Sequence, residues 1–325
     1  MQITLFVPDL GSACANHPLQ RRLPVLETLF TRARTQPARG DSVILAEIFD
    51  LAATEFAPAP FMRLADSGQR DSGFYFCADP VHLAPDRDQL LMLPLSVMQV
   101  QMEEAATLAE TFNHMYEAEG YRLETPQAGR WYLRYPAVLN CITHEPAKVA
   151  GQAVFDFMPS GKDGSRLKQL MNEIQMLFFE HPVNLAREAA GKPAINSLWL
   201  WGGGYLPEEA IPEKTIKTPK HVVTNMPLVA GLARFAGSEC TSWPSKSPFS
   251  KYSGDVLIGI NSEGERGMAP LEEQLAVPLL HALRHGQISE AILYPGNKQG
   301  YRVTQSSLRR FWRRRRPLSE ILGTA

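Results

Sequence analysis

The sequence has 325 residues, a mass of 36.2 kDa and a formal net charge of -1, with 44% hydrophobic and 21% charged residues. These values are typical of a folded chain of about two domains, and they exclude extensive disorder. No apolar run reaches the ~18 residues that a membrane helix needs, and the N-terminal segment does not resemble a signal peptide, so we expect a cytoplasmic protein without a membrane partner.

The first part of the chain opens with an apolar run that predicts a buried strand over Ile3–Val7. Helical spacing of apolar residues then predicts helices over Leu19–Arg34 and Val43–Leu51 and a helical turn over Phe61–Ala65. The pattern changes after this turn, and it predicts a long helix over Ser96–Glu119 among strands at Gly73–Ala78, Asp88–Leu93, Tyr121–Glu124 and Trp131–Tyr135. We therefore predict an inserted α+β module over residues 73–143.

The second part of the chain alternates helices with short apolar strands. The expected strands are Ser197–Trp201, Asp255–Ile260 and Glu290–Tyr294. The expected helices are Leu167–Phe178, Pro182–Ala190, Pro227–Phe235, Ala269–Arg284 and Ser306–Arg315. This alternation predicts an α/β core domain with a central, mostly parallel sheet, formed by residues 1–72 and 144–325.

The four cysteines, Cys14, Cys77, Cys141 and Cys240, are isolated in the sequence and form no CxxC spacing. They predict reduced thiols, and they exclude a disulfide scaffold and a cysteine-rich zinc site. The sequence also lacks the GxSxG, HExxH and Walker motifs.

Two segments carry residues that suit metal binding. Asp9 follows the first predicted strand, where open α/β sheets place their ligands, so its carboxylate is a candidate ligand for a divalent metal. The alternative is an aspartate that caps the next turn. Asp79 and His82 combine a carboxylate with an imidazole, which suits a metal or an acid/base site. The alternative is that these residues have no such role, since their spacing is irregular and the adjoining Asp86-Arg87-Asp88 has the pattern of a solvated turn.

A second group of residues suits an anionic ligand. Asn172 and Gln175 share one helical face, and Asn184 shares another with Arg187. Amides beside a guanidinium suit a phosphate or a carboxylate. The alternative is a buried polar network that fixes the helix pair on the sheet.

A glycine run follows the strand that contains Trp199 and Trp201. Alternation places both indoles on one side of this strand, which begins directly after Asn196, and Gly202, Gly203 and Gly204 come directly after the strand. Glycines at a strand end let the backbone approach a ligand closely, or they form a tight turn against a neighbouring loop.

The C-terminal segment is strongly basic. Residues 302–325 contain seven arginines and one glutamate, a net charge of +6, which leaves -7 for the rest of the chain. Arginines mixed with aromatics over Arg309–Arg316 suit nucleic acid. Because the rest of the chain is acidic, we instead favour packing of Phe311 and Trp312 on the body of the protein, with the arginines in solvent.

Several of these motifs together resemble the RpfE-type regulatory protein family. The matching stretches are Ala78-Asp79-Pro80-Val81-His82-Leu83, Asn172-Glu173-Ile174-Gln175-Met176-Leu177, His181-Pro182-Val183-Asn184, Asn196-Ser197-Leu198-Trp199-Leu200-Trp201-Gly202-Gly203-Gly204 and Leu293-Tyr294-Pro295-Gly296-Asn297-Lys298-Gln299-Gly300-Tyr301. That family is similar to the archaeal-type cofactor-independent phosphoglycerate mutases of the alkaline-phosphatase superfamily. The resemblance implies a central sheet with helices on both faces and an inserted smaller domain.

The resemblance also implies two divalent metal ions, Mn or Zn, and a serine that becomes phosphorylated. Asp9 matches the aspartate after the first strand, and Gly40-Asp41-Ser42 is a reordered counterpart of the Gly-Ser-Asp nucleophile motif, which makes Ser42 the candidate serine. The expected Asp-x-x-x-His motif is absent after Asp255–Ile260, and the expected Asp-His-Ser motif is absent after Glu290–Tyr294.

These departures lead to three hypotheses. The first is a catalytically degenerate mutase-like protein that serves as a regulatory scaffold or binds a small phosphorylated or carboxylate ligand, with Asn184, Arg187, Asn196, Trp199 and the glycines as the pocket wall. The second is a metal-dependent phosphomutase or phosphoesterase with relocated ligands, first among them Asp9, Asp79 and His82. The third is a nucleic-acid-binding regulator that acts through Arg309–Arg316.

Overall fold

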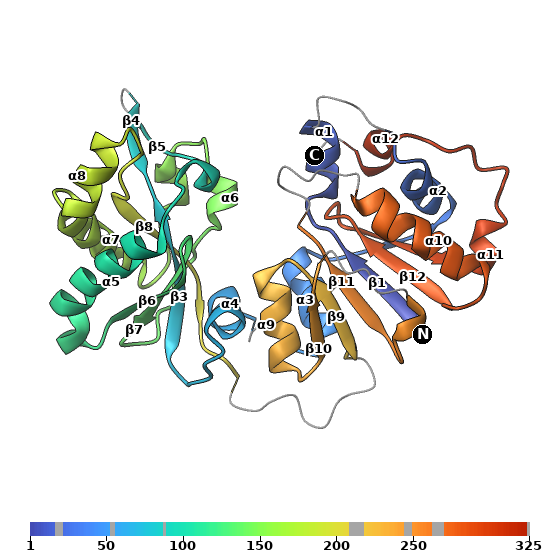
Figure 1. Cartoon of the computed structure of the whole chain (residues 1–325), viewed down its shortest axis with the longest axis horizontal. Helices are drawn as coiled ribbons and strands as arrows, with labels where there is room; N and C mark the ends of the chain where they lie inside the picture. Colours follow the sequence, from blue (N-terminus) through green and yellow to red (C-terminus); the bar gives the residue numbers. More distant parts are fainter. Residues whose placement is uncertain are drawn as a thin grey trace. The chain divides into compact units, whose positions relative to one another are not determined.

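The computed structural model describes residues 1–16, 22–52, 56–86, 89–207, 218–243, 249–261 and 270–323. The chain divides into two units, the core unit of Met1–Phe56 and Glu209–Ala325 and the inserted unit of Ala57–Glu208 (Figure 1). The predicted fold class is confirmed, since a large, mostly parallel sheet with helices is accompanied by a separate antiparallel module. No helix in the described ranges is long and apolar enough to span a membrane.

The core unit is built on a sheet of seven strands in the order β10-β9-β11-β1-β12-β13-β2, called here the large sheet. Neighbouring strands from β10 to β12 are parallel, β13 is antiparallel to β12, and β2 is antiparallel to β13. The strands are β1 (Gln2–Phe6), β2 (Arg34–Pro37), β9 (His221–Thr224), β10 (Glu239–Ser242), β11 (Val256–Gly259), β12 (Glu290–Tyr294) and β13 (Gln299–Thr304).

Helices cover both faces of the large sheet, with α2 and α10 on one face and α3 and α9 on the other (Figure 1). A buried core lies between β1, β11 and β12 and the first pair of helices. The helices are α1 (Leu10–Asn16), α2 (Pro24–Arg32), α3 (Asp41–Ile48), α9 (Pro227–Phe235), α10 (Val277–Arg284), α11 (Gln305–Leu308) and α12 (Leu318–Leu322), and a π-helical segment, Leu271–Ala276, precedes α10.

The inserted unit contains an antiparallel sheet of four strands in the order β6-β7-β3-β8, called here the small sheet. Its strands are β3 (Phe74–Val81), β6 (Arg122–Gln127), β7 (Arg130–Tyr135) and β8 (Ser197–Gly204), and β4 (Leu83–Asp86) pairs separately with β5 (Gln89–Met92). The helices are α4 (Pro58–Ser67), α5 (Met102–Tyr116), α6 (Pro146–Val149), α7 (Gly164–Phe178) and α8 (Pro182–Ala189). Aromatic and aliphatic side chains from the sheet and from α5 and α7 form its core.

The inserted unit is larger than the predicted module of residues 73–143. It also includes α4 and the segment from α6 to β8, because β8 pairs with β3 from Val81 to Tyr75. Periodicity indicated that residues 197–201 form a strand, but it carries no information about which sheet that strand joins. Strands β2, β9, β10 and β13 were also missed. Strands β2 and β10 are mostly exposed and lack an apolar run, and β13 mixes buried with exposed polar residues.

Candidate functional site

The carboxyl ends of the parallel strands meet at one edge of the large sheet, where open α/β sheets place their ligands. Asp9 follows β1, Asn225 follows β9 and Asn261 follows β11, while Gly296 lies in the turn after β12. Strand β2 runs in the same direction as β12, because each is antiparallel to β13. The loop after β2 therefore brings Ser42, at the start of α3, to the same edge.

An asparagine pair joins the ends of β9 and β11. The Asn225 side chain donates from Nδ2 to the Asn261 carbonyl at 3.0 Å and accepts at Oδ1 from the Asn261 amide at 2.8 Å. These two bonds hold the loops after β9 and β11 together, and the side chain that makes them is neutral. Sequence reasoning did not single out Asn225 or Asn261, although each directly follows a buried apolar run, which is the signal that could have identified them.

The turn after β12 packs tightly against the loop after β1. Gly296 has φ +86°, and a Cβ atom there would lie 1.8 Å from the carbonyl oxygen of Pro8. The Val7 amide donates to the Tyr294 carbonyl at 2.9 Å and continues the strand pairing up to this turn. A side chain therefore cannot be accommodated at Gly296 without movement of the Pro8 backbone.

Asp9 lies beside this tight contact, at the start of α1. Its carbonyl accepts the Ala13 amide at 2.9 Å, and its Oδ1 atom is buried. Burial is the main cause that raises the pKa of the nearby Cys14 thiol to about 11, and the negative charges of Asp9 and Glu27 raise it further. The carboxylate of Asp9 thus contributes negative charge near the carboxyl end of β1 and the Cys14 thiol.

Ser42 is exposed in the first turn of α3, which follows the N-cap residue Gly40. Strands β12 and β13 lie between β1 and β2 in the sheet order. At a spacing of about 4.8 Å per strand, the ends of β1 and β2 are separated by about 14 Å. The fold thus places the predicted serine at the predicted edge.

The described part of this edge does not fit a two-metal centre. Such a centre needs several carboxylates or imidazoles that converge on metals about 4 Å apart. At this edge the loop after β1 supplies the carboxylate of Asp9, and the start of α3 supplies that of Asp41, three strands away in the sheet order. Asn225, Asn261 and Gly296 supply amides or no side chain. Within the described ranges, no group of three or more His, Cys, Asp or Glu side chains is arranged to hold a metal ion.

The residues predicted to wall an anion pocket belong to the inserted unit, whereas the edge of the large sheet belongs to the core unit. Arg187 is 1% exposed; its guanidinium donates to the Pro193 carbonyl at 2.8 Å, to Glu104 at 2.6 Å and to the Met98 carbonyl. Asn184 bonds the carbonyls of Phe178 and Ile195 and the Ile195 amide. This geometry matches the alternative of a buried polar network that fixes helix α8.

Asn172 and Gln175 lie on α7 outside this network. Asn172 is exposed and Gln175 is partly buried, whereas Asn184 and Arg187 are buried. The two helical pairs of the sequence analysis therefore occupy different environments.

Strand β8 also uses its polar groups inside the protein. Asn196 exchanges two bonds with the Leu83 backbone, at 2.8 and 2.9 Å. Trp199 donates to the His144 carbonyl at 2.7 Å, and Trp201 donates to Asp79 at 2.7 Å. The structure thus places all three side chains in internal contacts.

The glycines that end β8 allow the backbone to pack against neighbouring elements. A Cβ atom on Gly203 would lie 2.2 Å from the Phe76 ring, and one on Gly204 would lie 2.2 Å from the Ala57 side chain. Gly202 has φ +65° and lies beside Pro58. The three glycines thus belong to strand β8 and pack against β3 and the start of α4, so the predicted end of the strand at Trp201 and the alternative of a tight turn after it are both wrong.

Asp79 is the most strongly perturbed carboxyl group of the inserted unit. It is 5% exposed on β3, and burial raises its pKa to about 7, while the hydrogen bond from Trp201 and the charge of Arg130 lower it. His82 instead directs Nδ1 to the Ala194 carbonyl at 2.8 Å. The two predicted metal ligands therefore have separate partners.

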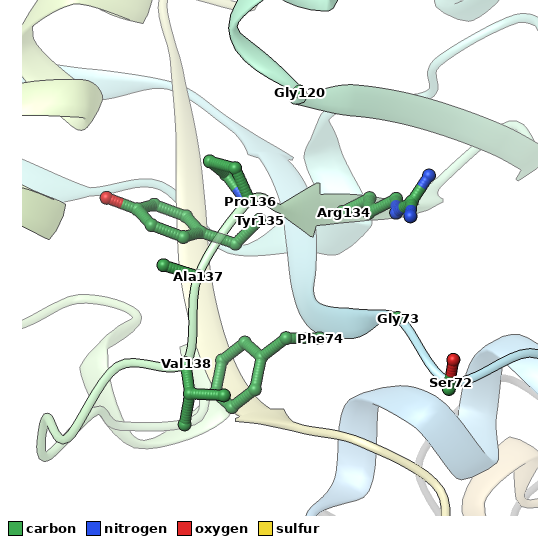
Figure 2. Close-up of a pocket in the computed structure, with 9 residues that line it drawn as sticks. All are labelled: Ser72, Gly73, Phe74, Gly120, Arg134, Tyr135, Pro136, Ala137 and Val138. Carbon is green, nitrogen blue, oxygen red and sulfur yellow. The ribbon is translucent and has the colours of Figure 1, made fainter.

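A surface pocket of about 370 Å³ lies in the inserted unit (Figure 2). Arg134 supplies its positive charge, Ser72 a hydroxyl group, and Phe74 and Val138 an apolar wall; the lining is completed by Gly73, Gly120, Tyr135, Pro136 and Ala137. Arg134 is directly opposite Arg122 in the pairing of β7 with β6. Arg122 is paired with Glu117 at 2.7 Å, so Arg134 is the guanidinium that the pocket lining offers to an anion.

The predicted helix over Ser306–Arg315 is wrong beyond Leu308. Helix α11 ends there, and the residues from Arg309 to Pro317 are not helical. The expected packing of the two aromatics is also wrong, because Phe311 is 79% exposed and Trp312 is 66% exposed.

The chain is similar to several curated phosphoglycerate mutases. It is 28% identical to the 2,3-bisphosphoglycerate-independent phosphoglycerate mutase of Methanosarcina mazei over 274 residues, which cover 78% of this chain and 69% of that protein. It is 29% identical to a probable 2,3-bisphosphoglycerate-independent phosphoglycerate mutase of Geobacter sulfurreducens over 191 residues, which cover 58% of this chain. The chain spans only about half of the Geobacter protein, at 48%. No family model matches the chain.

The fold is shared with a solved structure, the PH0037 protein from Pyrococcus horikoshii. That structure matches 90% of this chain and 80% of its own chain with a TM-score of 0.50 and 16% sequence identity. Together, the sequence similarities support homology of this chain to archaeal-type cofactor-independent phosphoglycerate mutases, on an alkaline-phosphatase-like α/β fold.

Proposed function

We propose that this chain is a phosphoglycerate-mutase-like protein that does not perform the metal-dependent mutase reaction and acts as a scaffold that binds a small anion. The observation that carries the proposal is the composition of the edge of the large sheet, where Asn225, Asn261 and Gly296 follow three parallel strands. The similarity to the mutases supports the scaffold. A regulatory role is supported by the sequence motifs that resemble RpfE-type regulatory proteins.

The physical reason is the charge that a two-metal centre requires. Neutral amides offer far weaker attraction to divalent cations than carboxylates do, and the Oδ1 atom of Asn225 already accepts the Asn261 amide. At Gly296 the close approach of Pro8 leaves no room for a ligand side chain. The described ranges therefore supply no cluster of carboxylates and imidazoles with which Asp9 could hold two metals.

Two measurements on the full chain test the loss of the reaction. We expect no interconversion of 3-phosphoglycerate and 2-phosphoglycerate in the presence of Mn²⁺ or Zn²⁺. We also expect elemental analysis of protein purified without chelators to find the same low metal content in the wild type and in Asp9→Ala. Near-stoichiometric Mn or Zn that disappears in Asp9→Ala would overturn the proposal.

The anion site is assigned to the Arg134 pocket. Its volume of about 370 Å³ lies in the range of small-molecule sites, and it combines one guanidinium with an apolar wall. Arg122, directly opposite Arg134 in the strand pairing, is paired with Glu117 at 2.7 Å, so the charge offered to a ligand here is that of Arg134. A phosphate or carboxylate group would receive charge-assisted bonds here, and its carbon skeleton would contact Phe74.

Calorimetric titration with 3-phosphoglycerate and with inorganic phosphate tests this assignment. Arg134→Gln is expected to weaken binding about tenfold or more, because a hydrogen bond to a charged group contributes about 1.5–3 kcal/mol. The matched control is Arg166→Gln, which removes the same charge from an arginine that is 68% exposed in the inserted unit. Equal affinities of the two variants would refute the assignment.

A second candidate function is a metal-dependent phosphomutase or phosphoesterase with relocated ligands. It is favoured by one observation, namely that Ser42 and Asp9 reach the same edge of the large sheet. This candidate predicts phosphoserine at Ser42 after incubation with 3-phosphoglycerate and Mn²⁺, detected by mass spectrometry and absent in Ser42→Ala. Our first proposal predicts an unmodified serine in this experiment.

A further inference from the structure

The C-terminal arginine segment, Arg309–Arg316, forms an exposed surface beside the carboxyl end of α2. Arginines at 309 and from 313 to 316 are exposed, and Arg310 is partly exposed. The segment contains no acidic residue. We call this surface the arginine surface.

The segment is anchored to the carboxyl end of α2 by its own side chains. Arg313 donates from Nη1 to the Ala33 carbonyl at 2.9 Å, and Arg310 lies within 3.5 Å of the carbonyls of Arg32 and Ala33. The last carbonyls of a helix carry partial negative charge, so these contacts are favourable. They hold the segment on α2 in a non-helical conformation.

The tertiary structure also brings Arg32 next to the segment, where it bonds the Leu308 carbonyl. Arg34 and Arg302 face the other side of the large sheet, because they alternate with residues such as Tyr301 that pack in the core with α2, and Arg302 is paired with Glu290. The nearby Glu27 carboxylate is 2% exposed and already paired with arginines, so it offers little negative charge to solvent.

Two neighbouring aromatic rings project from the same segment. Phe311 is 79% exposed and Trp312 is 66% exposed, and their centroids lie 5.4 Å apart in an edge-to-face arrangement. An edge-to-face pair covers at most one face of one ring, so flat ring surfaces remain open to solvent. Exposure of two large aromatic side chains to water is unfavourable in free energy, and a stacked base would remove this cost by covering their surface.

We propose that the arginine surface binds single-stranded nucleic acid. Guanidinium groups make paired bonds to phosphate, and exposed aromatic rings between them supply stacking platforms for bases. The segment lacks the amphipathic helix that interfacial membrane binding generally uses. This inference does not depend on the proposed function, because the arginine surface contains none of the residues assigned to the anion pocket or to the edge of the large sheet.

The test measures binding of the full chain to a fluorescent single-stranded RNA by anisotropy over a series of salt concentrations. The charge variant is Arg309→Gln/Arg314→Gln/Arg316→Gln, which leaves the anchoring side chains of Arg310 and Arg313 in place. Its matched control, Lys148→Gln/Lys162→Gln/Lys168→Gln, removes equal charge from exposed lysines of the inserted unit. Circular dichroism verifies that both variants fold.

We expect the arginine variant to reduce the slope of log K against log salt by about 2, since each phosphate contact contributes about 0.7 for single strands. The lysine variant is expected to bind like the wild type. A third variant, Phe311→Ala/Trp312→Ala, is expected to lose about tenfold or more in affinity with an unchanged slope, because stacking does not depend on salt.

Three results would overturn the proposal. The first is equal binding by the arginine and lysine variants, which would mean that the net charge of the protein, and not the position of these arginines, determines RNA affinity. The second is binding of a duplex of the same length as tightly as the single strand, since paired bases cannot stack on the exposed rings. The third is binding to vesicles that contain anionic lipid without binding to the RNA, which would identify a membrane surface instead.

Discussion

Replacing Asp79 by asparagine is expected to remove a pH dependence from the stability of the inserted unit. Asp79 lies on β3 within the small sheet, it is 5% exposed, and it accepts the Trp201 indole at 2.7 Å. Burial raises its pKa from 3.8 to about 7. The asparagine side chain would have nearly the same shape and could still accept the indole hydrogen bond, but it would not titrate.

The sign of the effect follows from proton binding. Because the folded pKa of Asp79 is above the unfolded value, the native protein keeps a proton between about pH 4 and pH 7 that the unfolded chain has released. The free energy of unfolding therefore falls as the pH rises through this window, and it becomes level above it. A change from 3.8 to about 7 corresponds to about 4 kcal/mol in total, of which about 3 kcal/mol lies between pH 5 and pH 8.

The assay compares urea unfolding of the wild type and Asp79→Asn from pH 5 to pH 8, followed by tryptophan fluorescence. The advantage of the variant over the wild type should grow by about 3 kcal/mol across this range. In parallel, the NMR resonance of the Trp201 indole should shift with a midpoint near pH 7 in the wild type only. The exposed Asp156→Asn serves as the control.

Parallel stability profiles of the wild type and Asp79→Asn would refute the reasoning. So would a Trp201 resonance that does not change between pH 5 and pH 9, since it would mean that Asp79 does not change its charge there.

Two further substitutions test the packing. Gly296→Ala should lower the free energy of unfolding by about 3 kcal/mol or more, because its Cβ would lie 1.8 Å from the Pro8 carbonyl oxygen. The control Gly286→Ala has a similar φ and open space around it, so it should cost about 1–2 kcal/mol. Similar melting temperatures of the two variants would contradict this prediction. Arg187→Ala should cost about 3–5 kcal/mol, since it leaves buried partners without their donor, whereas Arg166→Ala, at a surface ion pair, should cost less than about 1 kcal/mol in urea unfolding.

The elements that local sequence predicted well are those with strong local signals. Helix α9 was predicted with its observed bounds, Pro227–Phe235, because a proline at its first position precedes an apolar helical face. Strands β11 and β12 were predicted because each is a short apolar run between polar turns. Such elements depend on residues within a few positions of one another.

Polar side chains were harder to interpret, because their partners are distant in sequence. Arg187 bonds the Met98 carbonyl across 89 positions, and Trp201 bonds Asp79 across 122 positions. The residue types allowed either a ligand site or an internal network. The structure distinguishes the two by burial and by the partners already present.

The edge of the large sheet also contains residues that local sequence identified and residues that only the tertiary structure revealed. Sequence analysis identified Asp9 and Ser42 through position and resemblance, but it did not identify the Asn225–Asn261 pair, because strand β9 was not recognised. Pairing of β9 with β11 is a contact across more than thirty positions, and the buried run that forms β9 is only four residues long.

The sequence by itself determined the α/β class, most helices and central strands, and the basic character of the C-terminal segment, since these depend on local periodicity and composition. The tertiary structure decided the extent of the inserted unit, the burial of Arg187 and the exposure of Phe311 and Trp312. The physical reason is that burial and hydrogen-bond partners depend on which distant segments come together, and the free energy of each polar or aromatic side chain is set by that environment.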